Sequence, residues 1–368
     1  MQNLIFTLDY EIHGNGDGSP YKLMVEPTYR LMNLLEKYGF KLTILADIAE
    51  ILCFKKYFGE TGEDKFYYKE IEKQLQNAIQ RGHDVQLHIH SSYFKAQFDG
   101  KKWVQNWQEY NMAALDSQRI NEMIKSGVDL LENIILPVKS DYKVQAFRAA
   151  NWSMMPTENI YKALINNGIK IDTSVYKGGA QGGNVCYDYR EAYSNIKKYP
   201  ASPQNINHYD KSGELTEYPI YTEMRPFWHF VSLLRIFRMI RAKFHKHAKN
   251  ETEIADNSPA PIFNRCAETG TDCKSAPAKT FKDSKKLSLK SFFRKSAWKL
   301  DFNQASGQQM ISALKRIQKL DLQQDNIPVV LIGHSKTFVP YNEKTLEKFL
   351  KWAKKQKNIE FGLFRDTK

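Results

Sequence analysis

The sequence predicts an α/β fold in which parallel strands alternate with helices. Short apolar runs of strand length recur along the chain, and the stretches between them repeat apolar residues at helical spacing. Hydrophobic residues make up 42% of the 368 positions, which is enough to fill one or two cores. The longest apolar runs fall short of the ~20 residues that span a bilayer. The four cysteines are too few for a disulfide scaffold, so we expect free thiols.

The elements of the first half of the chain follow from local signals. Leu4–Leu8 is an apolar run of strand length, and Pro27 lies in the first turn of a helix with one apolar face. Gly82 ends a second helical pattern, and Asp116 and Thr157 are the expected N-caps of two more helices. These signals predict strands over 3–8, 41–46, 85–90, 144–147 and 169–173, and helices over 27–38, 66–81, 117–135 and 157–168.

The second half continues the alternation after a less regular stretch. We expect a flexible loop over 178–184, helices near 305–322 and 343–356, and strands over 328–333 and 359–363. Strands that alternate with helices of about 10–15 residues indicate parallel β/α packing. In such folds the functional residues gather at the C-terminal ends of the strands.

The net charge of +13 is concentrated in one segment. Residues 225–300 contain 17 Lys and Arg against 6 Asp and Glu, a net +11, and the rest of the chain carries +2. The protein is therefore a nearly neutral body with one basic segment. This distribution argues against a nucleic-acid-binding surface spread over the fold, and no recognisable nucleic-acid module is present.

Polar side chains stand at the ends of five predicted strands. Two carboxylates, Asp9 and Glu11, follow the first strand, and two histidines, His88 and His90, end the third. The other ends carry Arg148, Asp172 with Ser174, and His334. Because parallel strands deliver their carboxyl ends to one rim, these side chains are expected to meet.

The residue types at this rim indicate metal-assisted hydrolysis of an amide or ester. Residues two apart on a strand share a face, so His88 and His90, and likewise Asp9 and Glu11, can point into one site. Asp9, Glu11, His88 and His90 all suit Zn²⁺ or a similar divalent metal such as Co, Mn or Ni. An ion held by three such groups activates water and polarises a carbonyl. Asp9 is then either a ligand or the general base, a role that another carboxylate could also fill, with Arg148 as the ion-pair partner of Asp9 and His334 as the acid for the leaving group.

In this arrangement the chain resembles the NodB-homology polysaccharide deacetylases, carbohydrate esterase family 4. The resemblance rests on five segments in order: Thr7–Tyr10, Gly82–His88, Arg148–Trp152, Asp172–Val175 and Leu331–His334. It implies a distorted (β/α) barrel, a divalent metal and removal of acetyl groups from sugars. By residue it implies Asp9 as base, His88 as metal ligand, Arg148 as partner of the base and His334 as acid. We further expect Trp152, Asp172 and Ser174 to bind substrate.

The chain departs from the family pattern at three positions. Tyr10 stands where the family has a ligand aspartate, and Ser92 where it has its second ligand histidine. The third segment also lacks the family's proline and has Ala149-Ala150 instead. Glu11 and His90 are the nearest substitutes for the missing ligands, so the set Glu11, His88 and His90 is inferred from this chain. The pattern looks like a divergent branch associated with lipopolysaccharide and capsule biosynthesis.

The expected substrate is an N-acetylated sugar on a nucleotide- or lipid-linked intermediate. Two alternatives remain open: a catalytically silent sugar-binding or scaffold protein of a glycan assembly complex, and a related deformylase or other amide hydrolase. Aromatic side chains outside the motifs, Trp103 and Trp107, either stack on sugar rings or pack internally, and Glu217 either lines the groove or belongs to a structural pair.

The basic segment divides the predicted barrel into two parts. We expect residues 1–224 to form its first part, 225–300 an insertion and 301–368 its completion. Large apolar residues and arginines alternate over 226–244, which is typical of an amphipathic helix at an anionic membrane, although such a helix can also pack on the barrel. We also expect a second interfacial helix over 287–300. The start of the chain lacks the features of a secretory signal, so we expect a cytoplasmic protein, peripheral at the inner face of the membrane.

Overall fold

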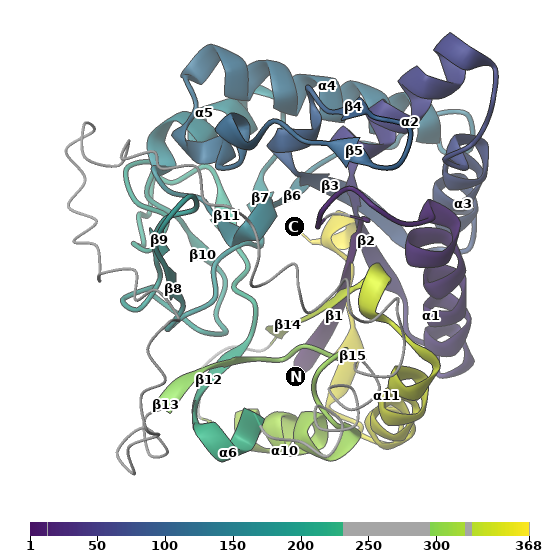
Figure 1. Ribbon diagram of the computed structural model, residues 1–368. Coiled ribbons are helices and arrows are strands. Elements are labelled where there is room, and N and C mark those ends of the chain that lie inside the picture. Colours follow the sequence, from purple (N-terminus) through teal and green to yellow (C-terminus); the bar gives the residue numbers. More distant parts are fainter. Residues whose placement is uncertain (13, 231–294, 321–325, 368) are drawn as a thin grey trace, which may run out of the picture.

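A computed structural model describes residues 1–12, 14–230, 295–320 and 326–367, and it is built around one curled sheet (Figure 1). The strands lie in the order β10-β11-β7-β6-β3-β2-β1-β14, and β15 also pairs with β1. All neighbours are parallel except β10 and β11. Their bounds are β1 Gln2–Tyr10, β2 Leu42–Asp47, β3 Asp84–Ile89, β6 Ala146–Ala149, β7 Ile171–Asp172, β10 Tyr199–Pro200, β11 Thr216–Glu217, β14 Ile327–His334 and β15 Ile359–Phe361.

The segment after β11 brings the two edges of the sheet together. Ile220 donates its backbone N–H to Val175 on the side of β7, and the same residue forms a parallel bridge with Val330 of β14. The backbone N–H of Tyr221 also donates to Val330. The sheet therefore curls back on itself, and the predicted distorted (β/α) barrel is confirmed.

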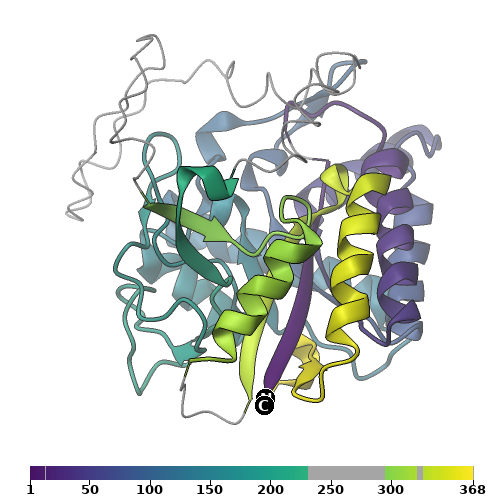
Figure 2. The same cartoon turned by 90° about the horizontal axis from the view of Figure 1, so that it is seen from below.

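Helices surround the sheet on its outer side (Figure 1). Figure 2 shows α1, α11 and α10 side by side along one flank, and contacts join α11 to both of its neighbours. The long helices are α1 Glu26–Lys37, α2 Ile48–Thr61, α3 Tyr68–Gln80, α4 Ser117–Ile135, α5 Thr157–Asn166, α10 Gly307–Ile317 and α11 Pro340–Ala353. The small elements are η1 Tyr21–Val25, η2 Ser91–Tyr93, η3 Trp107–Glu109, η4 Met112–Ala114, η5 Ala150–Trp152, η6 Ser335–Thr337, η7 Phe364–Asp366, β4 Gln97–Phe98, β5 Trp103–Val104, β8 Ala180–Gln181 and β9 Tyr187–Asp188.

Two local expectations need correction. Helix α2 was missed because its first two turns are buried almost all round, so they lack the one-sided apolar pattern of a surface helix. Thr157 is not the N-cap of α5: its hydroxyl donates to the carbonyl of Met154 and accepts from the N–H of Ile206. Asp116 does cap α4, since its side chain accepts from the N–H of Arg119.

The apolar core has two compartments separated by the sheet. The larger one lies between the sheet and the helices. The smaller one fills the inside of the barrel, with contributions from every side of it: Ile5, Ala146, Ile171, Tyr218, Ile220, Val330, Ile332 and Phe364. Side chains alternate along each strand, so the residues that follow these inner positions by two or four places face the same interior nearer the carboxyl ends.

The ends of the basic segment form an antiparallel ribbon against the barrel. Strand β12 (Thr222–Pro226) pairs with β13 (Lys295–Lys299), and the short helix α6 (Phe227–Phe230) follows β12. The expected second interfacial helix is therefore wrong for Lys295–Lys299, because these residues complete a sheet. Residues 231–294, with most of the expected membrane helix, lie outside the described residues, and the proposed division at 224 and 300 stays a prediction. In the described part of the chain, no helix has the length and apolar character needed to cross a membrane.

Candidate active site

The carboxyl ends of four strands carry the predicted catalytic residues to one rim of the barrel. Asp9 on β1 lies directly opposite His334 on β14. His88 on β3 lies opposite Arg148 on β6 on one side and opposite Asp47 on β2 on the other. The parallel register therefore brings residues that are far apart in the sequence into adjacent positions.

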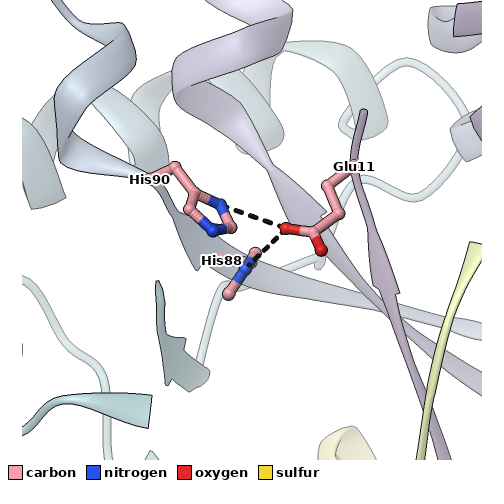
Figure 3. A group of neighbouring side chains, drawn as sticks. All are labelled: Glu11, His88 and His90. Carbon is pink, nitrogen blue, oxygen red and sulfur yellow. Dashed lines mark ion pairs between the residues drawn. The ribbon is translucent and has the colours of Figure 1, made fainter. Parts of the chain in front are cut away.

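Glu11, His88 and His90 form a compact cluster with the geometry of a metal site (Figure 3). One ligand atom from each residue lies within 4.8 Å of the others, and all three side chains are buried. Glu11 Oε2 is 3.4 Å from His88 Nε2 and 3.1 Å from His90 Nδ1. We refer to these three residues as the Glu-His-His cluster.

Both histidines of the cluster are oriented by a hydrogen bond from Nδ1. His88 Nδ1 donates to the backbone carbonyl of Arg148 over 2.8 Å, and His90 Nδ1 donates to Asp47 Oδ2 over 2.8 Å. In His88 the bonded nitrogen is the one turned away from Glu11, and metal-binding histidines typically make this kind of bond with the nitrogen that does not bind the ion. In His90 the bonded Nδ1 is also the nitrogen that lies 3.1 Å from Glu11 Oε2. His88 Nε2 is buried and has no hydrogen-bond partner in the described part of the chain. An unsatisfied buried nitrogen beside a carboxylate fits a bound cation.

The electrostatics of the cluster also fit a cation. Burial alone would lower the pKa of His88, yet Glu11, Asp9 and Asp47 together raise it to about 9. This shift reports a negative potential at the ring, which a divalent ion would satisfy as well as a proton. Lys336 adds a competing positive charge, because its Nζ lies 2.9 Å from Glu11 Oε1, the oxygen that does not face the histidines.

Arg148 holds Asp9 in its ionised form. The arginine side chain is fully buried, and its Nη1 donates to Asp9 Oδ1 over 2.6 Å. Its remaining donors reach Thr7 Oγ1 and both the carbonyl and the hydroxyl of Thr173. Burial would raise the pKa of Asp9, but the positive charges of its neighbours, that of Arg148 above all, outweigh burial and lower it. Asp9 is thus a carboxylate at neutral pH.

His334 stands at the more open side of the site. Its Nε2 is 3.4 Å from Asp9 Oδ2, and its side chain is 20% exposed. Burial lowers its pKa more strongly than the carboxylates of Asp9 and Glu11 raise it. The imidazole is therefore neutral at rest and can accept a proton before passing it on.

Asp172 and Ser174 are fully buried, and each polar atom of their side chains already has a hydrogen-bond partner. Ser174 Oγ donates to Asp172 Oδ1 over 2.7 Å and accepts from the backbone N–H of Ala149, while Asp172 Oδ2 accepts from the N–H of Ser174. Glu217 also bonds to Asp172, and burial raises the pKa of both carboxyls. Through these bonds Asp172 and Ser174 support the strand that carries Arg148, and Glu217 pairs with Asp172. Contact of Asp172 and Ser174 with substrate stays a prediction.

The aromatic candidates divide into one at the site and two away from it. Trp152 is half-buried, and its ring centroid is 6.1 Å from that of His334. Its backbone is held at a φ of 59°, which is uncommon for a bulky residue and is typical of functional sites. Trp103 packs in a cluster of aromatic rings that includes Phe54 and Phe66. Trp107 is exposed and contacts Tyr110, so it remains open as a sugar platform.

Sequence reasoning missed three charged residues of this region. Asp47 orients His90, Lys336 pairs with Glu11, and Lys299 reaches the site from β13. Asp47 directly follows a predicted strand, a position that the strand-end rule covers. Lys336 comes two residues after His334 and could have been found in the same way.

Comparison with known proteins finds distant similarity. No family model and no curated protein matches the chain. The 4-α-glucanotransferase of Thermococcus litoralis has a TM-score of 0.48 at 12% identity, and the match covers 99% of this chain but 39% of that one. PuuE allantoinase has a TM-score of 0.46 at 11% identity, with 99% and 88% covered. A family 4 carbohydrate esterase from Streptomyces lividans, solved in complex with acetate, has a TM-score of 0.28 at 11% identity, with 46% and 61% covered. These similarities assign neither an activity nor a substrate.

Proposed function

We propose that this protein is a metal-dependent hydrolase that removes the acetyl group from an N-acetylated sugar. The observation that carries the proposal is the juxtaposition of the Glu-His-His cluster with an Arg148–Asp9 ion pair and His334 on one rim. Hydrolysis of an unactivated amide needs an electrophile, a base for water and an acid for the leaving amine. The rim offers a candidate for each.

Glu11, His88 and His90 would hold the ion. With one carboxylate and two imidazoles the donor set favours zinc, and cobalt, manganese or nickel are the alternatives. A divalent ion supplies the electrophile that activates water and polarises the acetamide carbonyl. Asp47 and the carbonyl of Arg148 keep the two rings oriented for this role.

Asp9 and His334 would share the proton transfers. Asp9, kept ionised by Arg148, takes a proton from the attacking water as its oxygen bonds to the carbonyl carbon. Asp9 Oδ2 lies 3.4 Å from His334 Nε2, so the proton can pass from the carboxyl group to the neutral imidazole. His334 then protonates the sugar nitrogen as the C–N bond breaks, and acetate and a free amine leave.

The substrate class and its cellular setting rest on the resemblance of the motifs. We place the reaction in lipopolysaccharide or capsule biosynthesis, on a nucleotide- or lipid-linked sugar at the cytoplasmic face of the membrane. The basic segment over 226–244 would hold the enzyme at anionic lipid.

One observation favours a second candidate, a catalytically silent sugar-binding protein. Lys336 pairs with Glu11 and supplies a positive charge at the cluster without any metal. In that case the Glu-His-His cluster would be a structural network. Metal content separates the two candidates.

The test is an acetate-release assay on the full chain, with zinc supplied, against N-acetylated sugar nucleotides and polyprenyl-linked sugars. We expect about one ion per chain, lost in the double variant His88→Ala/His90→Ala. Asp9→Asn should keep the ion and lose about 10²–10⁴-fold in rate. His208→Ala, an exposed histidine outside the site, is the matched control. Metal-loaded protein that releases no acetate from any of these substrates would refute the proposed activity on them.

A further inference from the structure

The ammonium group of Lys299 lies inside the candidate active site although its residue comes from the end of the basic segment. Its Nζ is 3.1 Å from the ring centroid of Trp152 and 4.3 Å from that of Tyr176. Trp152 in turn contacts His334. Lys299 is therefore within one side chain of the proposed acid.

The strand that carries Lys299 is fixed from both sides. Trp298 is buried and packs its ring against His229, whereas Lys299 points to the opposite face of β13. Ala297 shares the face of Lys299 and lies against the turn at Gly178, where an added Cβ would come within 3.2 Å of Ala297 Cβ. The ribbon of β12 and β13 thus holds the lysine against the 176–178 turn.

Lys299 is a cation without an anionic partner. Within the described part of the chain its ammonium makes neither a hydrogen bond nor an ion pair, and its close contacts are the two aromatic faces. Lys299 is half-buried, and withdrawing an unpaired ammonium group even partly from water costs free energy. Burial, opposed by the more distant Asp301 and Asp9, lowers the pKa of Lys299 to about 7. Contact with aromatic rings compensates part of this cost and leaves three N–H donors unused.

Lys299 lies on the less buried side of the candidate site. The Glu-His-His cluster is almost completely buried, while His334 and Lys336 are 20% and 22% exposed in their side chains. The accessible side of the site is therefore the side of His334 and its neighbour Trp152. An unused cation at that mouth is suited to a negatively charged group on the incoming molecule.

We propose that Lys299 is a substrate-binding residue that holds an anionic group, a carboxylate or a phosphate, on the sugar whose acetamide is hydrolysed. This inference rests on the proposed function and narrows its substrate to acidic or phosphorylated N-acetyl sugars. A purely structural lysine, which would only cover the two rings, would not distinguish charged from neutral sugars. The binding of matched sugars separates these two roles.

The test measures binding to the full chain without turnover, using three probes: N-acetylglucosamine, its 1-phosphate and the corresponding N-acetylated uronic acid. The wild-type protein should bind at least one anionic probe about 10-fold or more tightly than the neutral sugar. Lys299→Met should remove that preference and leave the neutral sugar unchanged, and Lys299→Arg should restore most of it. Lys295→Met, on the same face of β13 but exposed, is the control. The phosphate and carboxylate probes tell which anion is preferred.

Several outcomes would overturn the inference. Equal binding of neutral and anionic sugars by the wild type would do so without any variant, even if Lys299→Met failed to fold. Equal weakening of all three probes by Lys299→Met, with a lowered melting temperature, would assign the lysine a structural role. Binding is measured without acetate release, so the binding result can be interpreted even if the protein proves not to be a hydrolase.

Discussion

The two sides of the active-site rim differ in how completely their polar atoms are used. On the side of Arg148, each of the three guanidinium nitrogens donates to Asp9, Thr7 or Thr173. On the side of the Glu-His-His cluster, His88 Nε2 has no hydrogen bond in the described part of the chain, and Glu11 Oε2 faces two imidazole rings. Both sides are equally buried.

The difference indicates what each side is for. Burial of polar groups costs free energy unless they are paired, so a complete network is a stable support. An incomplete network at the same depth is costly by itself and becomes favourable when a ligand completes it. The Arg148 side is therefore suited to hold Asp9 ionised and in place, and the Glu-His-His side could hold an ion.

The largest effect on stability should come from removing Arg148 from its completely paired network. Arg148→Met leaves the Asp9 carboxylate buried without its partner, which should lower the free energy of unfolding by about 3–5 kcal/mol. His88→Ala, on the incomplete side, should cost clearly less in metal-free protein, because Glu11 keeps Lys336 as an ion-pair partner and Asp9 keeps Arg148. Denaturant unfolding of the two variants in a chelator measures both.

A double variant sharpens this prediction. Arg148→Met/Asp9→Asn removes the unpaired charge, so it should recover part of the loss. Equal destabilisation by Arg148→Met and His88→Ala would contradict the contrast between the two sides.

A smaller effect, on the affinity for metal, is expected from a substitution of Asp47. Asp47→Asn keeps an oxygen for the N–H groups of Ala49 and His90 but loses the anionic acceptor for His90 Nδ1. Loss of such a supporting carboxylate should weaken zinc binding by about 10–100-fold. Competition with a chromogenic chelator measures the affinity, and Asp129→Asn, an exposed aspartate on α4, is the control. Unchanged affinity would mean that His90 is not a ligand.

Much of the rim could be predicted because the signal is local and periodic. Asp9 with Glu11, and His88 with His90, are two apart at the ends of apolar runs, and parallel strands bring such ends together. The same rule also selected Asp172 and Ser174. It could not tell that their polar atoms satisfy one another, since pairing inside the fold depends on the neighbouring strands.

Lys299 was not identified from the sequence, for a different reason. Its segment was treated as one basic stretch, and its charge was counted with 16 other basic residues, 17 in all over 225–300. Its role depends on pairing between β13 and β12, which are separated by the rest of that segment. Non-local pairing of this kind leaves no periodic trace in the sequence.

A third buried histidine extends the contrast to the opposite end of β3. His83 Nδ1 accepts from the N–H of Leu42 over 3.0 Å, and His83 Nε2 lies 2.9 Å from Glu36 Oε1, so both nitrogens are used. Burial lowers the pKa of His83 to about 4, despite the raising effect of Glu36. In contrast to His88, this ring is neutral in the folded protein and complete without a ligand.

The smallest predicted effect follows from that lowered pKa. The unfolded chain binds a proton at His83 below about pH 6.5 and the folded chain does not, so folding stability falls as the pH drops. When the pH drops from about 7 to about 5.5, the free energy of unfolding of the wild type should fall by about 1 kcal/mol because of His83. The variant His83→Gln should not show this loss. Denaturant unfolding of both proteins at both pH values gives the change in free energy for each. Asp84, with a pKa raised to about 6, titrates in both proteins, so subtracting one pH dependence from the other isolates His83. Parallel pH curves would show that His83 is charged in the folded state, and the contrast between the two ends of β3 would then fail.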